Sequence, residues 1–488
     1  MSDPVTAAAP TTRHALVGTV RVVLAESLLI PTGLLTAAYL ARHLGPEGYG
    51  LFTLAAAVVA WVEWSLTALF GRASVKFVAE AADWRPIGAT ILSAYLAIAL
   101  AGALALWLLA APVAALLGKP VLAGYLRLFA VDIPLFSLAQ AHRSILVGLG
   151  NFSERALAAA ARWVSRLVLV VLLVELGLSI EGAILGSIGA SLIELTVARV
   201  FVRPGLSVRM ALPARKLLAY AGPLLLSALA LRLYDKLDLV TLTALGGSAE
   251  QAGLYGAAQN LAILPGIFAA PFAPLLLSTL GRAFRDGQGT LAQSIGRDAM
   301  RGVLLLVPFA GLVAGSAVEI VTLVFGPAFS AAAPLLSWLI FAAVALVQIS
   351  IAMAILTAAD RPGVTLAMTV PLPLLALSGY LVLIPQRGPA GAALVTAACA
   401  GLAALAAVFA VHRVCRVLPS MGTVVRASLL CVGAYAIAAL WATPGFLLLV
   451  KLPIIGIAIL LGFRLFGEFS MVELKAARAL LRRQPSAG

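Results

Sequence analysis

The sequence has few charged residues and few of the residue types on which most metal sites and disulfide frameworks depend. Only 11% of its 488 residues are charged, and it contains three cysteines and four histidines. An ordinary soluble domain is about a quarter charged. The cysteines are widely spaced, which excludes a disulfide framework and a CxxC metal site. The composition therefore argues against a water-soluble fold, and we expect neither a bound metal nor a cofactor.

The motifs that mark common enzyme active sites are also missing. The sequence has no GxxxxGK[ST] loop, which argues against a built-in ATPase, and neither HExxH nor GxSxG occurs in a suitable context. We therefore expect a protein that is not an enzyme.

Long apolar runs dominate the chain instead. Hydrophobic residues make up 62% of it, and the mean hydropathy is +1.07. A helix needs about 20 apolar residues to cross a hydrocarbon layer of roughly 30 Å. Runs of this length cover residues 18–40, 50–70, 88–110, 121–147, 157–178, 182–202, 217–245, 253–280, 303–325, 331–358, 364–384, 390–411, 424–443 and 446–466. Because these runs lack the alternation of a β-barrel, they predict an all-α polytopic membrane protein with about 14 transmembrane helices.

The basic residues indicate how these helices are oriented. If the N-terminus is cytoplasmic, 25 of the 34 Lys and Arg residues lie on the cytoplasmic side and 4 on the opposite side. This is the bias expected of a membrane protein. We therefore expect both termini in the cytoplasm. The same scatter explains the net charge of +14 without nucleic-acid binding, which requires a single basic stripe.

A weak internal repeat divides the apolar runs into two halves. Its copies, at a spacing of roughly 200 residues, are Leu44-Gly45 then Tyr49-Gly50, and Leu245-Gly246 then Tyr255-Gly256. Six helices separate the copies, so the halves are parallel repeats. We expect an N-lobe over 1–202, a cytoplasmic linker over 203–216, a C-lobe over 217–411, two extra helices within 412–466, and a cytoplasmic amphipathic tail over 467–488.

Charged residues within the apolar runs are the candidates for a functional site, since charges at membrane depth are costly unless they face a cavity or a partner. Arginine and lysine bind phosphate well, whereas acidic side chains can carry a coupling ion. The cavity candidates for binding substrate are Arg232, Lys236, Arg166, Arg162 and Arg127; the ion-coupling candidates are Asp235, Asp238, Glu63 and Glu26. Two structural alternatives stay open: Arg232 pairs with Asp235, and Arg162 extends to the cytoplasmic interface.

Three short motifs resemble the polysaccharide transporter branch of the multidrug/oligosaccharidyl-lipid/polysaccharide flippase superfamily. They are residues 39–52 (YLARHLGPEGYGLF), 232–238 (RLYDKLD) and 252–255 (AGLY). The resemblance implies two six-helix lobes around a central cavity that opens alternately to either side, with two further helices at the C-terminus. It implies a bacterial inner-membrane flippase that moves an undecaprenyl-pyrophosphate-linked oligosaccharide to the outer leaflet for surface polysaccharide synthesis. By the same resemblance we expect a monomer that works beside glycosyltransferases and a polysaccharide polymerase.

Other functions fit parts of the pattern. A peptidoglycan lipid-precursor flippase shares the number of spans and a cationic cavity. A cation-coupled multidrug antiporter of the same superfamily would favour an acidic cavity. A membrane-embedded glycosyltransferase or polymerase usually has a large extracytoplasmic loop, and none of the expected outer loops is large. The lipid-linked oligosaccharide flippase is the function that the sequence favours.

Overall fold

The fold of the described residues is helical throughout. The computed structural model describes residues 28–206, 233–269 and 272–469, and no β-strand occurs among them. The all-α fold class predicted from the apolar runs is therefore confirmed. The chain divides into two compact units, Met1–Gly256 and Ala257–Gly488.

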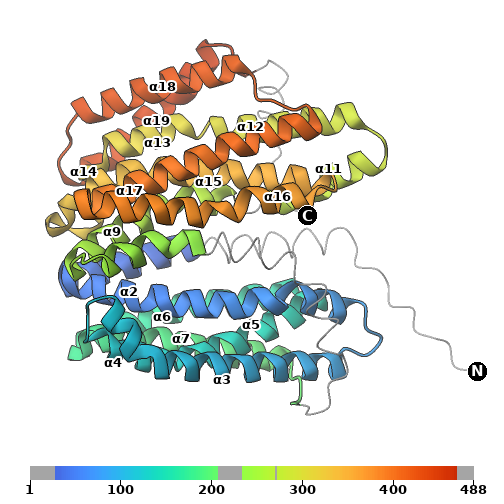
Figure 1. Cartoon of the computed structure of the whole chain (residues 1–488), viewed down its shortest axis with the longest axis vertical. Helices are drawn as coiled ribbons and strands as arrows, with labels where there is room; N and C mark the ends of the chain where they lie inside the picture. The colour runs from blue at the N-terminus through green and yellow to red at the C-terminus, as the bar shows by residue number, and fades with distance from the viewer. Residues whose placement is uncertain (1–27, 207–232, 270–271, 470–488) are drawn as a thin grey trace, which may run out of the picture. The chain divides into compact units, whose positions relative to one another are not determined.

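The first unit is a bundle of long helices (Figure 1). Its helices are α2 (Leu29–Ala79), α3 (Trp84–Leu116), α4 (Leu122–Phe129), α5 (Asp132–Gly148), α6 (Phe152–Leu173), a π-helical turn (Val174–Leu178), α7 (Ser179–Phe201), helical residues 233–244 and the first turns of α9 (Ala249–Ala262). Helix α5 contacts α2, α3, α6 and α7. An apolar core forms where α2, α3, α5 and α7 meet, with Phe70, Tyr95, Ile145 and Ala198 among its buried members.

The second unit is built around α15. Its helices are α10 (Leu264–Ala269), α11 (Phe272–Arg285), α12 (Gly289–Leu304), α13 (Val307–Gly315), α14 (Ala317–Phe325), a 3-10 turn (Pro327–Ala332), α15 (Ala333–Ala358), α16 (Pro362–Thr369), α17 (Pro371–Cys415), α18 (Met421–Leu440), a 3-10 turn (Gly445–Leu447) and α19 (Leu448–Leu465). Helix α15 contacts α11, α13 and α17 (Figure 1). Helices α18 and α19 pack on α13 through a separate core, which includes Leu312, Ile455 and Phe463.

Glycine residues redirect the chain within three long helical segments. Gly45 in α2 has φ 65° and Gly388 in α17 has φ 55°, values that a residue with a Cβ adopts only with strain. Gly177 has a similar role between α6 and α7. Gly45 and Gly388 fall between expected spans, and Gly177 lies at the end of one. The close turns of the chain therefore follow the boundaries predicted from the apolar runs.

The described residues contain nine helical segments that are long and apolar enough to cross a membrane. Three of these, Pro31–Thr67, Phe152–Phe201 and Gly363–Cys415, each contain parts of two expected spans joined at a glycine, so the nine segments contain all or part of twelve of the fourteen expected spans. The largest shift is at Gly289–Gly315, which begins before the expected span 303–325 and ends within it. The other two expected spans, 217–245 and 253–280, lie partly outside the described residues, as does the start of the span 18–40.

The outer surface of these helices is apolar. On α3, Leu100, Leu104, Trp107 and Leu108 are each at least half exposed. A row of large apolar side chains of this kind would drive aggregation in water, whereas a lipid environment accommodates it. The chain is a multi-pass membrane protein. The orientation of its termini stays a prediction, as do the lobe and linker boundaries, because much of the linker and of the C-terminal tail lies outside the described residues.

The two copies of the repeat motif meet inside the first unit. A Cβ on Gly50 would lie 1.8 Å from the carbonyl oxygen of Ala249, and a Cβ on Gly253 would lie 2.0 Å from the carbonyl oxygen of Pro46. The second half of α2 and the start of α9 therefore cross with their backbones in contact. Only glycine at both positions permits this crossing.

A carboxylate anchors the segment that follows α19. Glu468 Oε1 accepts hydrogen bonds from Arg301 Nε at 2.7 Å and Thr423 Oγ1 at 2.6 Å, and Oε2 accepts one from Arg426 Nη1 at 2.7 Å. Arg301 Nη2 also donates to the backbone carbonyl of Glu468. This residue therefore joins α12 to α18 at the end of the second unit.

Replacing Glu468 with glutamine is expected to lower the free energy of unfolding by about 1–3 kcal/mol, because two arginines lose a charged acceptor. Burial by itself would raise the pKa of Glu468, but the hydrogen bonds from Thr423, Arg426 and Arg301 outweigh it and hold the pKa below its ordinary value. A carboxylate with a lowered pKa makes its full contribution to the free energy of unfolding above its ordinary pKa of about 4.3. This contribution is lost as the pH falls through the lowered pKa, because the group becomes protonated. Thermal unfolding in detergent should therefore show a difference between wild type and Glu468→Gln that shrinks below about pH 4. Asp298→Asn, on the exposed side of α12, is the matched control and should unfold like the wild type.

Candidate functional site

A cluster of charged side chains, with buried acidic members and half-buried arginines, lies where four helices of the first unit meet. Glu63 comes from α2, Asp132 from the start of α5, Arg162 and Arg166 from α6, and Glu194 from α7. All three acidic residues are at most 5% exposed. Arg162 and Arg166 share a face of α6 because they are one turn apart. The candidates Arg162, Arg166 and Glu63, which are far apart in the sequence, therefore lie together.

Glu194 holds one side of this cluster in place. Its carboxylate lies 3.0 Å from Nε of Arg143 and 3.5 Å from Nη1 of Arg162. The carboxyl groups of Glu63 and Asp132 are close enough to each other, and to Arg162 and Arg166, to interact electrostatically. Three acidic and three basic side chains thus share one buried region, which allows each charge to be compensated by its neighbours.

Several polar atoms of the cluster have no hydrogen-bond partner among the described residues. They are Oε1 of Glu63, Oδ1 of Asp132, and Nε of both Arg162 and Arg166. Buried polar atoms are almost always paired in proteins, and exceptions need an explanation such as a bound ligand, ion or water. The cluster can therefore offer both cationic donors and anionic acceptors to a bound group. Among the described residues, no three His, Cys, Asp or Glu side chains are arranged to hold a metal ion.

Aromatic rings border the cluster. The guanidinium carbon of Arg162 lies 4.4 Å from the ring centre of Phe136 and 5.7 Å from that of Trp163. The ring of Trp64 lies 6.2 Å from the ring of Phe136. Stacking against rings fixes the position of Arg162 and keeps its edge available for hydrogen bonds.

The candidates among the helical residues 233–244 are not members of this cluster. Asp238 is buried, and its Oδ2 accepts a hydrogen bond of 2.8 Å from the hydroxyl group of Tyr255. Asp235 is exposed, and Lys236 is partly buried. Arg232 and Glu26 lie outside the described residues. Arg127 is exposed on α4, where its guanidinium carbon lies 5.3 Å from the ring centre of Trp107. The roles expected for all these residues stay predictions.

The sequence candidates did not include three members of the cluster. Asp132 and Glu194 are acidic residues within apolar runs, and Arg143 lies near the end of the expected span 121–147. An acidic residue inside an apolar run was the available signal, since such a residue needs a partner. The pairing of Glu194 with Arg143 depends on α5 and α7 lying side by side, which the sequence alone does not specify.

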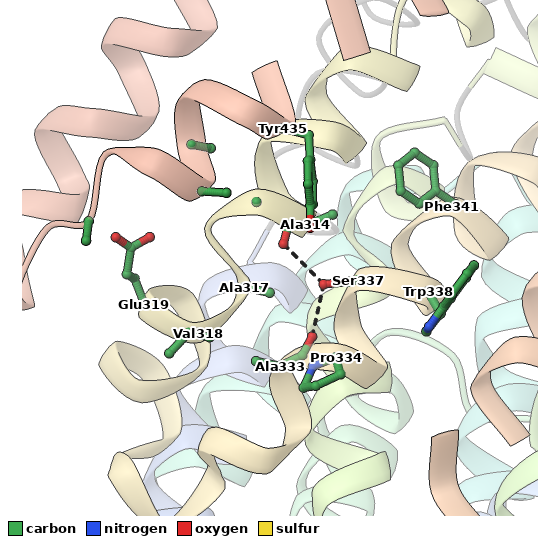
Figure 2. Close-up of a pocket in the computed structure, with 14 residues that line it drawn as sticks. Ala314, Ala317, Val318, Glu319, Ala333, Pro334, Ser337, Trp338, Phe341 and Tyr435 are labelled. Carbon is green, nitrogen blue, oxygen red and sulfur yellow. Dashed lines mark hydrogen bonds between the residues drawn. The ribbon is translucent and has the colours of Figure 1, made fainter. Parts of the chain in front are cut away.

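A separate apolar cavity of about 680 Å³ lies in the second unit, between α13, α14, α15 and α18. Figure 2 shows Trp338, Phe341 and Tyr435 around it, with Ser337 donating to the carbonyl oxygens of Ala314 and Ala333. Glu319 is the charged residue among those that line it. The lining suits a hydrocarbon group better than a phosphate.

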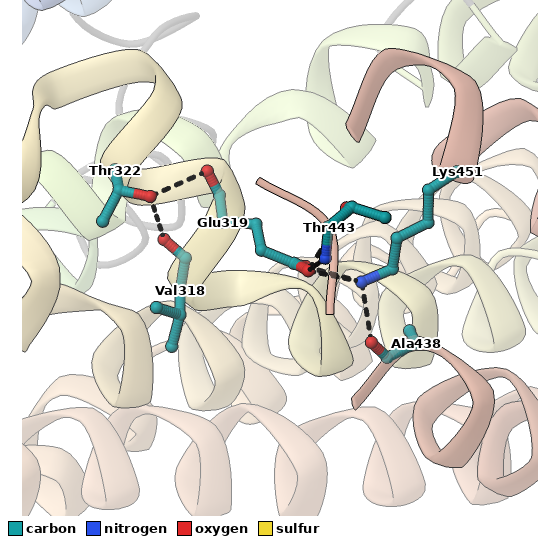
Figure 3. A network of polar contacts seen from close by, with 6 residues as sticks. All are labelled: Val318, Glu319, Thr322, Ala438, Thr443 and Lys451. Carbon is teal, nitrogen blue, oxygen red and sulfur yellow. Dashed lines mark hydrogen bonds and ion pairs between the residues drawn. The ribbon is translucent and has the colours of Figure 1, made fainter. Parts of the chain in front are cut away.

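The charge of Glu319 is compensated at the edge of this cavity. Lys451 Nζ lies 2.8 Å from Oε1 and 2.6 Å from Oε2 of Glu319, and it also donates to the carbonyl oxygen of Ala438 at 2.7 Å (Figure 3). The backbone N–H of Thr443 donates to Glu319 Oε1 at 2.7 Å. The pair joins α14 to α19 and to the loop before it, so its first role is structural.

Comparison with solved structures shows the fold. The chain resembles the lipid II flippase MurJ in an inward closed conformation with a TM-score of 0.77 and 15% identity, over 96% of this chain and 100% of that one. It resembles a mutant of the MATE transporter VcmN from Vibrio cholerae with a TM-score of 0.59 and 17% identity, over 83% and 97%. A transporter of the MOP superfamily from Pyrococcus furiosus gives 0.57 and 16%, over 86% and 96%.

Comparison of sequences identifies the family. No curated protein matches the chain. The family described as polysaccharide biosynthesis protein matches residues 17–276, which is more than half of the chain and includes the whole charged cluster. This protein therefore belongs to the polysaccharide biosynthesis protein family.

Proposed function

We propose that the protein moves an undecaprenyl-pyrophosphate-linked oligosaccharide from the cytoplasmic to the outer leaflet of a bacterial inner membrane. The observation that carries this proposal is the pair of half-buried arginines, Arg162 and Arg166, beside buried carboxyl groups in a member of the polysaccharide biosynthesis protein family. A pyrophosphate must lose its hydration shell to cross a membrane, and guanidinium groups replace that shell with charge-assisted hydrogen bonds.

The acidic members of the cluster suit reversible binding. In the structure, Glu194 neutralises part of the charge of Arg162, and the carboxyl groups of Glu63 and Asp132 lie near both arginines. An incoming pyrophosphate can exchange places with these carboxylates, so the arginines are never left without a counter-charge. Uptake of a cation by Glu63 and Asp132 would then compensate the added negative charge. This arrangement supports binding strong enough for entry and weak enough for release.

The gene product's cargo can be identified directly. Deletion of the gene is expected to cause an undecaprenyl-pyrophosphate oligosaccharide to accumulate on the cytoplasmic side while surface polysaccharide disappears, which mass spectrometry of extracted lipids would show. The likeness to the lipid II flippase favours a peptidoglycan lipid precursor as the second candidate cargo. Accumulation of that precursor instead would select the second candidate.

Replacing Arg166 with glutamine is expected to lower the rate of transport at least tenfold. The loss of charge-assisted hydrogen bonds costs about 1.5–3 kcal/mol, and about 1.4 kcal/mol corresponds to a factor of ten. The rate is measured as surface polysaccharide restored to the deletion strain at equal protein abundance. Arg85→Gln is the matched control, because Arg85 has an exposed side chain at the start of α3. Full activity of Arg166→Gln would remove this arginine from the proposed site.

A further inference from the structure

A cavity of about 480 Å³ lies where several helices of the second unit end or begin. It is bordered by the end of α11, the start of α12, the turn between α15 and α16, and the end of α17. Its volume is within the range of about 300–1,000 Å³ that is common for ligand sites. None of its lining residues belongs to the charged cluster of the first unit or to the apolar cavity beside Glu319.

The sequence places all the segments around this cavity at one membrane surface. The expected spans 253–280, 331–358 and 390–411 end beside it, and two spans separate each of these ends from the next. All three ends are therefore expected on the same side, and the structure brings them together. The bias of the basic residues assigns this side to the cytoplasm. We therefore expect the cavity at the depth of the lipid headgroups.

The two turns that border the cavity have a defined backbone. In the turns after α11 and α15, Gly287 and Asp360 have positive φ values of 69° and 59°. The next backbone N–H in each turn donates to the carbonyl oxygen five residues earlier, at 2.9 Å in both cases. This is the hydrogen bond of a Schellman motif, which closes the end of a helix. Arg285 and Arg361 thus project from backbone whose hydrogen bonds are already made.

The charge around the cavity is positive. Arg285 and Arg361 line it, together with one acidic residue, Asp360. Within the described part of the chain, neither guanidinium group forms an ion pair. Three more exposed arginines lie at the ends of the same helices: Arg282, Arg413 and Arg416. The five arginines outweigh Asp286, Asp360 and the partial negative charge, of about half a charge each, at the ends of α11, α15 and α17.

We propose that this cavity binds the headgroup phosphate of an anionic phospholipid. Arg285 and Arg361 hold the phosphate by charge-assisted hydrogen bonds. Gln293 and Asp360, which also line the cavity, offer an amide and a carboxylate to headgroup hydroxyl groups. The apolar part of the lining, which includes Phe284, continues into the core around α15 and suits the glycerol backbone and the start of the acyl chains. Basic pockets between helices at the cytoplasmic surface bind anionic headgroups in this way.

The test compares two lipids that differ only in headgroup. The full-length protein in detergent is titrated with phosphatidylglycerol and with phosphatidylcholine, and native mass spectrometry measures the bound lipid. We expect wild type to bind phosphatidylglycerol about tenfold more tightly, a difference of about 1.4 kcal/mol. Combining Arg285→Gln with Arg361→Gln should bring the two affinities together. Combining Arg285→Lys with Arg361→Lys keeps both charges and should retain part of the preference.

A matched control separates a defined site from general attraction. Arg85→Gln combined with Arg297→Gln removes two exposed arginines from the same expected surface but outside the cavity, and should leave the preference unchanged. Loss of the preference in this control would show that the attraction is spread over the surface, and the site would be wrong. Equal affinities in wild type, or a preference that survives the loss of Arg285 and Arg361, would also overturn the proposal.

A soluble competitor distinguishes a lipid from a free phosphate compound. Glycerol phosphate, which lacks the acyl chains, should not displace phosphatidylglycerol at equal concentration. Displacement would assign the cavity to a soluble phosphate compound instead of a lipid. Thermal unfolding confirms that each variant is folded. Because no cargo is present in these titrations, their outcome does not depend on the proposed function.

Discussion

Replacing Lys451 with methionine is expected to lower the free energy of unfolding by about 3–5 kcal/mol, because it leaves a carboxylate without its counter-ion in a low-dielectric region. Lys451 is 0% exposed, and its ammonium group contacts both oxygens of Glu319 and the carbonyl of Ala438. The variant should unfold at a distinctly lower temperature in detergent. The second unit should loosen first, since the pair joins α14 to α19 (Figure 3).

A double variant tests whether the loss comes from the unpaired charge. Lys451→Met combined with Glu319→Gln removes both charges, and should recover much of the stability because replacing a whole buried pair is often neutral. Lys119→Met, at a partly exposed lysine, is the matched control and should have a small effect. Equal unfolding temperatures for wild type and Lys451→Met would show that the pair contributes nothing to the fold.

Replacing Gly50 with alanine is expected to abolish most transport, because the added methyl group cannot fit in the helix crossing of the first unit. The new Cβ would lie 1.8 Å from the carbonyl oxygen of Ala249. The second half of α2 and the start of α9 would have to separate, at a cost of about 1–3 kcal/mol or more. Alternating access requires each end state to be reachable, so a strained crossing shifts the population away from the state described here. Gly253→Ala should act in the same way, since its Cβ would lie 2.0 Å from the carbonyl oxygen of Pro46.

Transport in the deletion strain and thermal unfolding of the purified variants measure this effect. Gly124→Ala is the matched control, because a Cβ at Gly124 in α4 would have no atom within 4 Å. This control should transport at the wild-type rate. If Gly50→Ala and Gly253→Ala do so as well, the crossing is not part of the transport cycle.

The charged cluster contains charges of both signs, which bears on the proposed transport site. The residues expected to bind substrate are all basic, and this expectation stays a prediction. In the structure, Arg162 and Arg166 belong to a cluster of three arginines and three carboxyl groups. A mixed cluster is less costly to bury than a cationic one, because its members compensate one another. If the cluster binds the proposed cargo, its counter-charges are present before the cargo arrives.

The sequence predicted the fold class and most span boundaries, because the bilayer imposes a length and a composition on each helix that can be read residue by residue. Gly45 and Gly388, where the chain turns, fall between expected spans because the apolar runs end near them. The sequence also marked Arg162, Arg166 and Glu63 as candidates, since a charge in an apolar run is costly wherever that run folds.

Only the tertiary structure decided which of these charges meet. Glu319 and Lys451 are 132 positions apart, yet the packing of α14 and α19 brings them together as an ion pair and buries Lys451. Glu194 likewise meets Arg143 and Arg162 because α5, α6 and α7 pack together. The apolar pattern determines that a helix lies in the membrane. Its neighbours, and so the partners of its charges, depend on side-chain packing over the whole bundle, which no local pattern encodes.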